Sequence, residues 1–189
     1  DKPLRDGDLL LIDAAGEYHG YAADITRTFP VNGRFSAAQK EVYEIVLAAQ
    51  LAAIDAVRPG NDFNAPHEAA LRVLTRGLVD LKLLQGEVDG LIESEAYKPW
   101  YMHKTGHWLG LDVHDAGDYK IKGAWRELQP GMALTVEPGL YIRPAADVPE
   151  ALWNIGIRIE DDVVVTEAGN RVLTAAAPKT VADIEAAMR

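Results

Sequence analysis

Four apolar, strand-like segments of this chain each carry one carboxylate, and one segment rich in histidine accompanies them. The carboxylates are Asp13, Asp24, Glu137 and Glu160, and the histidines are His103, His107 and His114. Burying unpaired carboxylates together costs far more free energy than single hydrogen bonds return, so such a group implies a cation between them. Four carboxylates and one imidazole suit two divalent ions about 3.5–4 Å apart, as in two-metal hydrolases. Oxygen-rich ligation favours manganese, with cobalt, zinc or iron(II) as alternatives.

Each of these residues also has a plainer interpretation. A carboxylate at the end of one strand usually faces solvent, and a single histidine is usually structural. The combination is what favours a site. Gly106 and Gly110 disfavour a helix over residues 101–115. His103 and His107 are therefore predicted to lie in an extended, turn-rich segment, whose glycines let the backbone approach a ligand closely.

The first two carboxylates are expected to meet through a hairpin. Residues 9–13 and 22–29 read as two strands joined by a turn at 17–20. Positions 13 and 24 are symmetric about that turn, so the two aspartates would face each other with Cβ atoms about 4.5–5.5 Å apart. The apolar residues before Asp13 would draw its carboxylate partly out of water. In a different register, both aspartates would be solvated turn residues.

The elements that surround the site can be read from periodicity and caps. Ser36 with Gln39 forms the capping-box pattern of a helix that ends at 58–60. A second helix begins at Asn64, and His67 near its start is predicted to be a surface histidine. A short acidic helix is expected within 83–96. The remaining predicted elements are strands at 131–137, 155–165 and 171–174 and a final helix over 181–188 capped by Thr180.

Composition narrows the class of protein. The chain has 189 residues, of which 48% are hydrophobic and 25% charged, and this suits one globular domain. The net charge of −10 disfavours nucleic acid and anionic membranes as partners. The absence of cysteine excludes thiolate chemistry and disulfides. We see no membrane-spanning run and no signal peptide, so a cytoplasmic protein is expected. A strand so close to Asp1 suggests a piece of a longer protein.

Five motifs occur in an order and at spacings that identify a family. They are the segments 12–16, 20–30, 107–115, 136–141 and 156–161. Together they closely resemble the bacterial aminopeptidase P (Xaa-Pro aminopeptidase) branch of the pita-bread metallopeptidases, family M24, from about Leu4 to the C-terminus. The resemblance implies an α+β pita-bread fold, in which helices flank a curved antiparallel sheet with metals at its concave centre. Residues 1–189 would then be a catalytic domain that lacks its N-terminal part.

The resemblance also assigns roles to residues. It implies that Asp24 and Glu160 bridge two metals, that Asp13 binds one of them, and that His107 and Glu137 bind the other. It further implies substrate contacts for His103, His114, Arg158 and Tyr141, with Tyr141 near a proline pocket to which Trp108 could contribute. A further substrate-binding histidine of the family precedes the first metal aspartate, and this chain has no counterpart of it.

The implied activity is removal of the N-terminal residue from peptides with proline in second position, by attack of a metal-bridging hydroxide. Glu137 would carry a proton to the leaving prolyl nitrogen, His114 would donate to the developing oxyanion, and His103 would donate to the substrate backbone. The expected partners are such peptides and, at full length, further copies of the chain. Whether this N-terminally incomplete chain is active alone stays open.

Several relatives of this fold are alternatives. A prolidase that cleaves only dipeptides is the nearest one, and methionine aminopeptidase fits the segment 108–114 less well. Pita-bread domains also serve as metal-free modules that bind peptides or histones, and creatinases use the fold for another hydrolysis. Those two alternatives usually lack metal ligands, whereas all five are present in this sequence.

Overall fold

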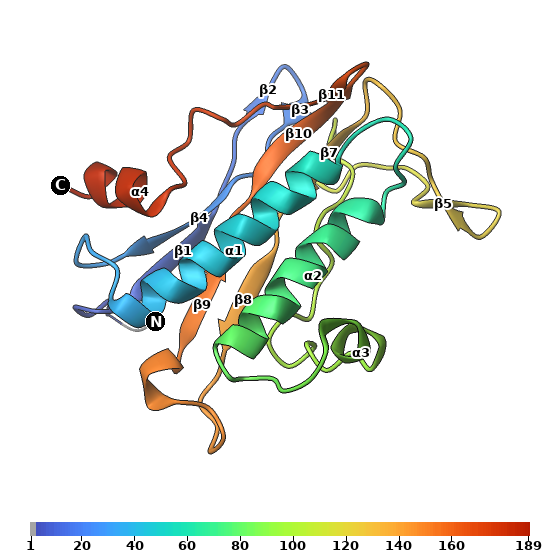
Figure 1. The fold of residues 1–189 in the computed structure, drawn as a ribbon. Coiled ribbons are helices and arrows are strands. Elements are labelled where there is room, and N and C mark those ends of the chain that lie inside the picture. The colour runs from blue at the N-terminus through green and yellow to red at the C-terminus, as the bar shows by residue number, and fades with distance from the viewer. Residues whose placement is uncertain (1–2) are drawn as a thin grey trace.

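A computed structural model describes residues 3–189. Two long helices, α1 (Ala37–Ala56) and α2 (Ala65–Asp80), lie side by side against one face of a layer of antiparallel strands (Figure 1). The family resemblance predicted this combination of helices over antiparallel strands. Within the described residues, none of the helices is both long and apolar enough to cross a membrane.

The strands pair only with antiparallel neighbours in the described part of the chain. The pairs are β1 (Leu9–Asp13) with β4 (Thr26–Pro30), β2 (Glu17–Tyr18) with β3 (Tyr21–Ala22), β5 (Lys120–Ile121) with β6 (Ala124–Trp125), and β8 (Gly139–Ile142) with β9 (Ile155–Arg158). A three-stranded sheet joins β7 (Ala133–Val136), β10 (Asp161–Thr166) and β11 (Gly169–Val172). Short helices α3 (Val88–Glu93), η1 (Glu150–Leu152) and α4 (Val181–Ala187) complete the elements.

The predicted hairpin register is wrong by two residues. Asp13 pairs with Thr26, not with Asp24. The turn is centred on His19 and Gly20, whose φ angles of 52° and 84° are those of a two-residue hairpin turn. Asp24 lies in the break between β3 and β4, outside the ladder. Asp13 is also more exposed than predicted, with 45% of its side chain accessible, because β1 pairs with β4 alone among the described residues.

The predicted helices are confirmed. Ser36 caps α1 and forms the full capping box with Gln39, and Thr180 caps α4. Helix α2 has Asn64 at its N-cap and a proline in its first turn, although the asparagine side chain makes no capping hydrogen bond. Gly77 of α2 lets the two long helices approach, because a Cβ atom there would lie 2.3 Å from Ile45 of α1.

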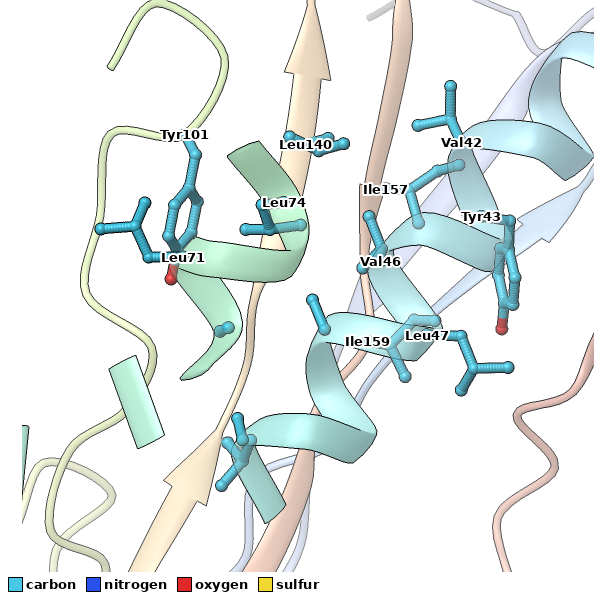
Figure 2. Close-up of a cluster of buried hydrophobic side chains, with 14 of the residues drawn as sticks. Val42, Tyr43, Val46, Leu47, Leu71, Leu74, Tyr101, Leu140, Ile157 and Ile159 are labelled. Carbon is cyan, nitrogen blue, oxygen red and sulfur yellow. The ribbon is translucent and has the colours of Figure 1, made fainter. Parts of the chain in front are cut away.

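The core joins the two helices to the strands that lead into the site. Val46 of α1, Leu74 of α2, Leu140 of β8 and Ile157 of β9 belong to one cluster of buried hydrophobic side chains (Figure 2). Leu140 and Ile157 are fully buried, whereas their strand neighbours Tyr141 and Arg158 are only partly buried. Alternation therefore fixes one face of β8 and β9 in the core and directs the next side chains to the opposite face.

The strand predicted over 155–165 is two strands in the structure. Strand β9 pairs with β8, the chain leaves this pairing at Ile159 and Glu160, and β10 then pairs with β7. The alternation of isoleucines was predicted correctly, since Ile155, Ile157 and Ile159 are all buried. The change of partner places Glu160 at the junction of the two strand groups.

Candidate metal centre

Three side chains from distant parts of the chain converge on one point. Asp24, His107 and Glu160 each offer a ligand atom, and these atoms all lie within 4.8 Å of one another. Asp24 comes from the break before β4, His107 from the irregular segment before β7, and Glu160 from the junction of β9 and β10. Asp24 is 8% exposed and Glu160 only 1%. A buried group of this composition has the donor set of a metal site.

The other two predicted ligands border this cluster. The His107 Nε2 atom lies 3.4 Å from Asp24 Oδ2 and 3.6 Å from Glu137 Oε1. Asp13 lies close enough to Asp24 for its carboxylate to help raise the pKa of Asp24. The structure thus brings all five predicted ligands into one neighbourhood, and their binding of metal stays a prediction.

The backbone orients His107 as a ligand histidine would be oriented. Its Nδ1 atom lies 2.9 Å from the carbonyl oxygen of Trp108, which can only accept, so Nδ1 carries the proton. In the neutral ring, Nε2 then presents a lone pair toward the carboxylates, and a cation between them satisfies both sides. Gly106 makes the approach possible, because a Cβ atom there would lie 2.0 Å from the carbonyl oxygen of Thr135.

The carboxylates lie in surroundings that oppose their ionisation. Burial, followed by the charge of Glu137, raises the pKa of Glu160 to about 8. Burial likewise raises the pKa of Glu137 to about 7, with Asp24 adding to the shift. Burial and the hydrogen bond with Asp13 raise the pKa of Asp24. These carboxylates can all be ionised near neutral pH only when a nearby positive charge stabilises them.

Hydroxyl and backbone groups hold the carboxylates in place. Thr26 donates its hydroxyl to Glu160 Oε2 over 2.5 Å, and Arg158 Nε donates to the same threonine over 3.3 Å. The Arg158 NH2 group donates to Asp13 Oδ2 at 2.6 Å. The backbone N–H of Asp24 donates to Asp162 at 3.1 Å. Because ligand orientation depends on such outer contacts, these residues act on the centre through its ligands.

A buried ion cluster behind the centre was not predicted from the sequence. Arg27 donates to the backbone oxygens of Thr26 and Glu160 at 2.9 and 2.5 Å, and its NH2 group lies 2.8 Å from Asp161 Oδ1. Lys179 lies 2.7 Å from the other oxygen of Asp161. Burial alone would raise the pKa of Asp161, but hydrogen bonds from Lys179 and Arg27 hold it below its usual value. The only sequence feature that could have indicated this cluster is that Arg27 and Asp161 both lie within apolar, strand-like segments.

His103 is already fully engaged in hydrogen bonds. Its Nδ1 atom donates to the carbonyl oxygen of Lys104 at 2.7 Å, so in the neutral ring Nε2 accepts from the Tyr141 hydroxyl at 2.8 Å. The Tyr141 hydroxyl in turn accepts from Arg158 NH1 at 3.1 Å. Burial lowers the pKa of His103, which disfavours the extra proton. In this arrangement Nε2 has no proton to give, so the predicted donation from His103 to a substrate would require both that Tyr141 be displaced and that Nε2 gain a proton.

The prediction that His67 is a surface histidine is wrong. Its Nδ1 atom lies 2.8 Å from the Thr105 hydroxyl, which is 2.6 Å from the hydroxyl of buried Tyr101. Burial, followed by the charge of Lys104, lowers the pKa of His67 to about 4. The apolar stripe of α2 could not reveal this, because the partner segment comes from elsewhere in the chain.

The centre opens into a cavity of about 800 Å³. His103, His107, His114, Glu137 and Arg158 line one part of its wall. The rest of the wall includes Phe63, His67, Lys104, Tyr119, Lys120 and Trp125. None of these six was predicted to line the site, because they come from several parts of the chain and share no motif or spacing. Trp108 is buried at 6% exposure and stacks on Tyr119 beneath this wall, so its predicted place in a proline pocket is not supported.

Comparison with known proteins agrees with this geometry. The model of metallopeptidase family M24 matches residues 1–167, and the chain belongs to this family, whose members use divalent metal ions. The chain is 57% identical to the Xaa-Pro aminopeptidase of Haemophilus influenzae over 98% of its own length and 43% of the relative.

Solved structures give the fold. The aminopeptidase PepP of Pseudomonas aeruginosa superimposes with a TM-score of 0.97 at 60% identity, covering 100% of this chain and 43% of that one. A zinc-substituted Escherichia coli aminopeptidase P in complex with product gives a TM-score of 0.94 at 53% identity, covering 100% of this chain and 43% of that one. The chain therefore has the pita-bread fold and spans less than half the length of these relatives.

Proposed function

We propose that this chain forms the metal-binding part of an Xaa-Pro aminopeptidase, which removes the first residue of peptides with proline in second position. The observation that carries the proposal is the convergence of Asp24, His107 and Glu160 within 4.8 Å at the base of a cavity. The high identity to Xaa-Pro aminopeptidases favours this activity over that of a dipeptidase. The presence of all five candidate ligands disfavours a metal-free binding module.

The donor set fits two divalent cations. Asp13, Asp24, His107, Glu137 and Glu160 would hold them. Manganese is the expected metal because the donors are mostly oxygen, and cobalt, zinc or iron(II) are alternatives. When bound, such cations lower the pKa of water and polarise a carbonyl group.

The chain's own residues would bind the peptide and move protons around the reacting bond. Glu137 lies at the edge of the cluster, with its Oε1 atom 3.6 Å from His107 Nε2, and a positioned carboxylate can move a proton to or from a reacting group. We assign to it the transfer of a proton to the leaving prolyl nitrogen. His114, whose ring centroid lies 4.2 Å from that of His107, would donate to the carbonyl oxygen of the first residue.

The test uses the protein at its full natural length, because the chain spans less than half of its relatives. Exhaustive chelation is expected to abolish cleavage of Ala-Pro-Ala, and manganese is expected to restore it. Glu160→Gln should lower kcat by about a thousandfold or more, since a bridging group would be lost. Exposed Glu167→Gln is the matched control and should retain activity.

Three outcomes would contradict the proposal. They are activity that survives chelation, full activity in Glu160→Gln, and cleavage of Ala-Ala-Ala as fast as of Ala-Pro-Ala. Cleavage of the dipeptide Ala-Pro alone would instead favour a prolidase. Cytoplasmic location and assembly into homo-oligomers stay predictions from the sequence.

A further inference from the structure

The cavity wall beyond the metal centre combines aromatic rings with two ammonium groups. The Phe63 ring lies 4.8 Å from the ring of Tyr119 and 6.5 Å from that of Trp125. Lys120 and Trp125 are paired across β5 and β6, and the Lys120 Nζ atom lies 4.2 Å from the Trp125 ring centroid. Lys104 Nζ approaches the same ring at 5.9 Å. We call these five residues the aromatic–basic wall.

The two ammonium groups of this wall are not neutralised within the described residues. Over residues 3–189, no carboxylate oxygen lies within 4.0 Å of either nitrogen, although the chain carries a net charge of −10. Both lysines border the same cavity as Glu137 and His107. Cation–π contact with Trp125 keeps their charge beside the cavity without cancelling it.

The distribution of charge in the cavity indicates how a bound peptide would be oriented. This step rests on the proposed function, in which the peptide's free amine and first carbonyl lie at the carboxylate-rich centre. The residues after the proline must then extend away from that centre through the remaining cavity. The wall that carries Lys104 and Lys120 is the part that can meet them.

We propose that the aromatic–basic wall binds the part of the substrate that follows the proline and favours a carboxylate there. The rings of Phe63, Tyr119 and Trp125 would pack against the apolar part of that residue, and the ammonium groups would pair with its negative charge. Two sources supply this chemistry, namely the C-terminal carboxylate of a tripeptide and an aspartate or glutamate side chain in a longer peptide.

The test measures kcat/KM of the metal-loaded, full-length enzyme on matched peptides. Ala-Pro-Glu-NH2 against Ala-Pro-Gln-NH2 isolates a side-chain carboxylate, and Ala-Pro-Ala against Ala-Pro-Ala-NH2 isolates the terminal one. Because contacts between exposed ions are individually weak, we expect the anionic peptide of at least one pair to be preferred by about three- to tenfold. Added salt should reduce that preference.

Variants locate the effect. Lys104→Met combined with Lys120→Met should bring the preferred ratio to about one. Lys122→Gln is the matched control, because it removes the same charge from the turn between β5 and β6 without touching the cavity, and it should retain the preference. Since all three lysines are exposed, these changes are not expected to disturb folding.

The outcomes separate this inference from the proposed function. Equal kcat/KM within both pairs in the unmodified enzyme overturns the inference, and so does a preference that survives in the double variant or disappears equally in Lys122→Gln. If the enzyme cleaves none of these proline peptides, both the proposed function and this inference are overturned. Cleavage that ignores charge overturns this inference alone.

Discussion

At the scale of single residues, the centre is a group of acids that disfavour one another's ionisation. Glu160 is almost fully buried, and Thr26 is the only side chain among the described residues that donates a hydrogen bond to its carboxylate. Glu137 and Asp24 add negative charge to the same space. The chain tolerates this arrangement in its fold because a cation can relieve it, so the acids should make the metal-free protein sensitive to pH.

We predict that the metal-free protein loses stability as the pH rises. Burial raises the pKa of Glu160 to about 8 and that of Glu137 to about 7, both from an ordinary value of 4.5. Between the ordinary and the raised values, the folded state binds more protons than the unfolded state, so the free energy of unfolding falls as the pH increases. The loss should begin above about pH 4.5 and be complete above about pH 8.

The measurement is a series of thermal unfolding curves after chelation. We expect the midpoint to fall by several degrees from about pH 5 to about pH 8.5, and manganese to reverse most of the fall at the higher pH. A midpoint that rises across this range in the metal-free protein would show that the acids are not crowded as the structure has them.

At the scale of elements, a glycine decides whether His107 can reach the centre. Gly106→Ala would place a Cβ atom 2.0 Å from the backbone oxygen of Thr135, and the backbone cannot yield as a flexible side chain can. The segment must then move away from β7 and carry His107 with it. We predict a roughly 10- to 100-fold loss of metal affinity, the usual scale when a ligand's support is disturbed.

Titration with manganese by calorimetry checks this prediction. Gly90→Ala in α3 is the control, because a Cβ atom there meets nothing within 4 Å and alanine suits a helix. Unchanged affinity in Gly106→Ala would mean that His107 does not depend on this close approach.

The secondary-structure elements also show which features of the fold and site the sequence can predict. The carboxylates were found because each is carried by an apolar, strand-like segment, and the capping box of Ser36 with Gln39 predicted the start of α1. The pairing of Asp13 was missed because a two-residue shift keeps every side chain on the same face, so the hydrophobic pattern fits either register. The position of His67 was missed because its partner Thr105 lies in another segment.

At the scale of the whole molecule, the end of the chain supports its centre. Arg27 donates to the backbone oxygens of Pro178 at 2.8 Å and Ala177 at 3.2 Å, and Lys179 pairs with Asp161 next to Glu160. These C-terminal residues lie beyond the 167 residues that the family model matches. Arg27 lies 151 positions from Pro178 and 150 from Ala177, and Lys179 lies 18 positions from Asp161, so no local pattern predicts these contacts.

We predict that Lys179→Met destabilises the protein by about 1–3 kcal/mol. The change leaves one oxygen of fully buried Asp161 with Gln50 as its remaining partner, and loss of a charged partner from a buried group carries a desolvation cost of this order. Urea unfolding provides the measurement. Lys98→Met is the control, because its ion pair with Glu95 is exposed on both sides, and it should unfold as the unmodified protein does. Equal midpoints for the two variants would remove Lys179 from the support of the centre.

Arg158 connects two parts of the site, because it forms hydrogen bonds with both Asp13 and Tyr141. One nitrogen of its guanidinium group donates a hydrogen bond to Asp13, and another donates to the Tyr141 hydroxyl, which is hydrogen-bonded to His103. A rigid fork cannot turn toward one neighbour without turning from the other. Because one guanidinium group holds both contacts, the position of Asp13 is linked through Arg158 to that of the Tyr141 hydroxyl and, one hydrogen bond further, to His103.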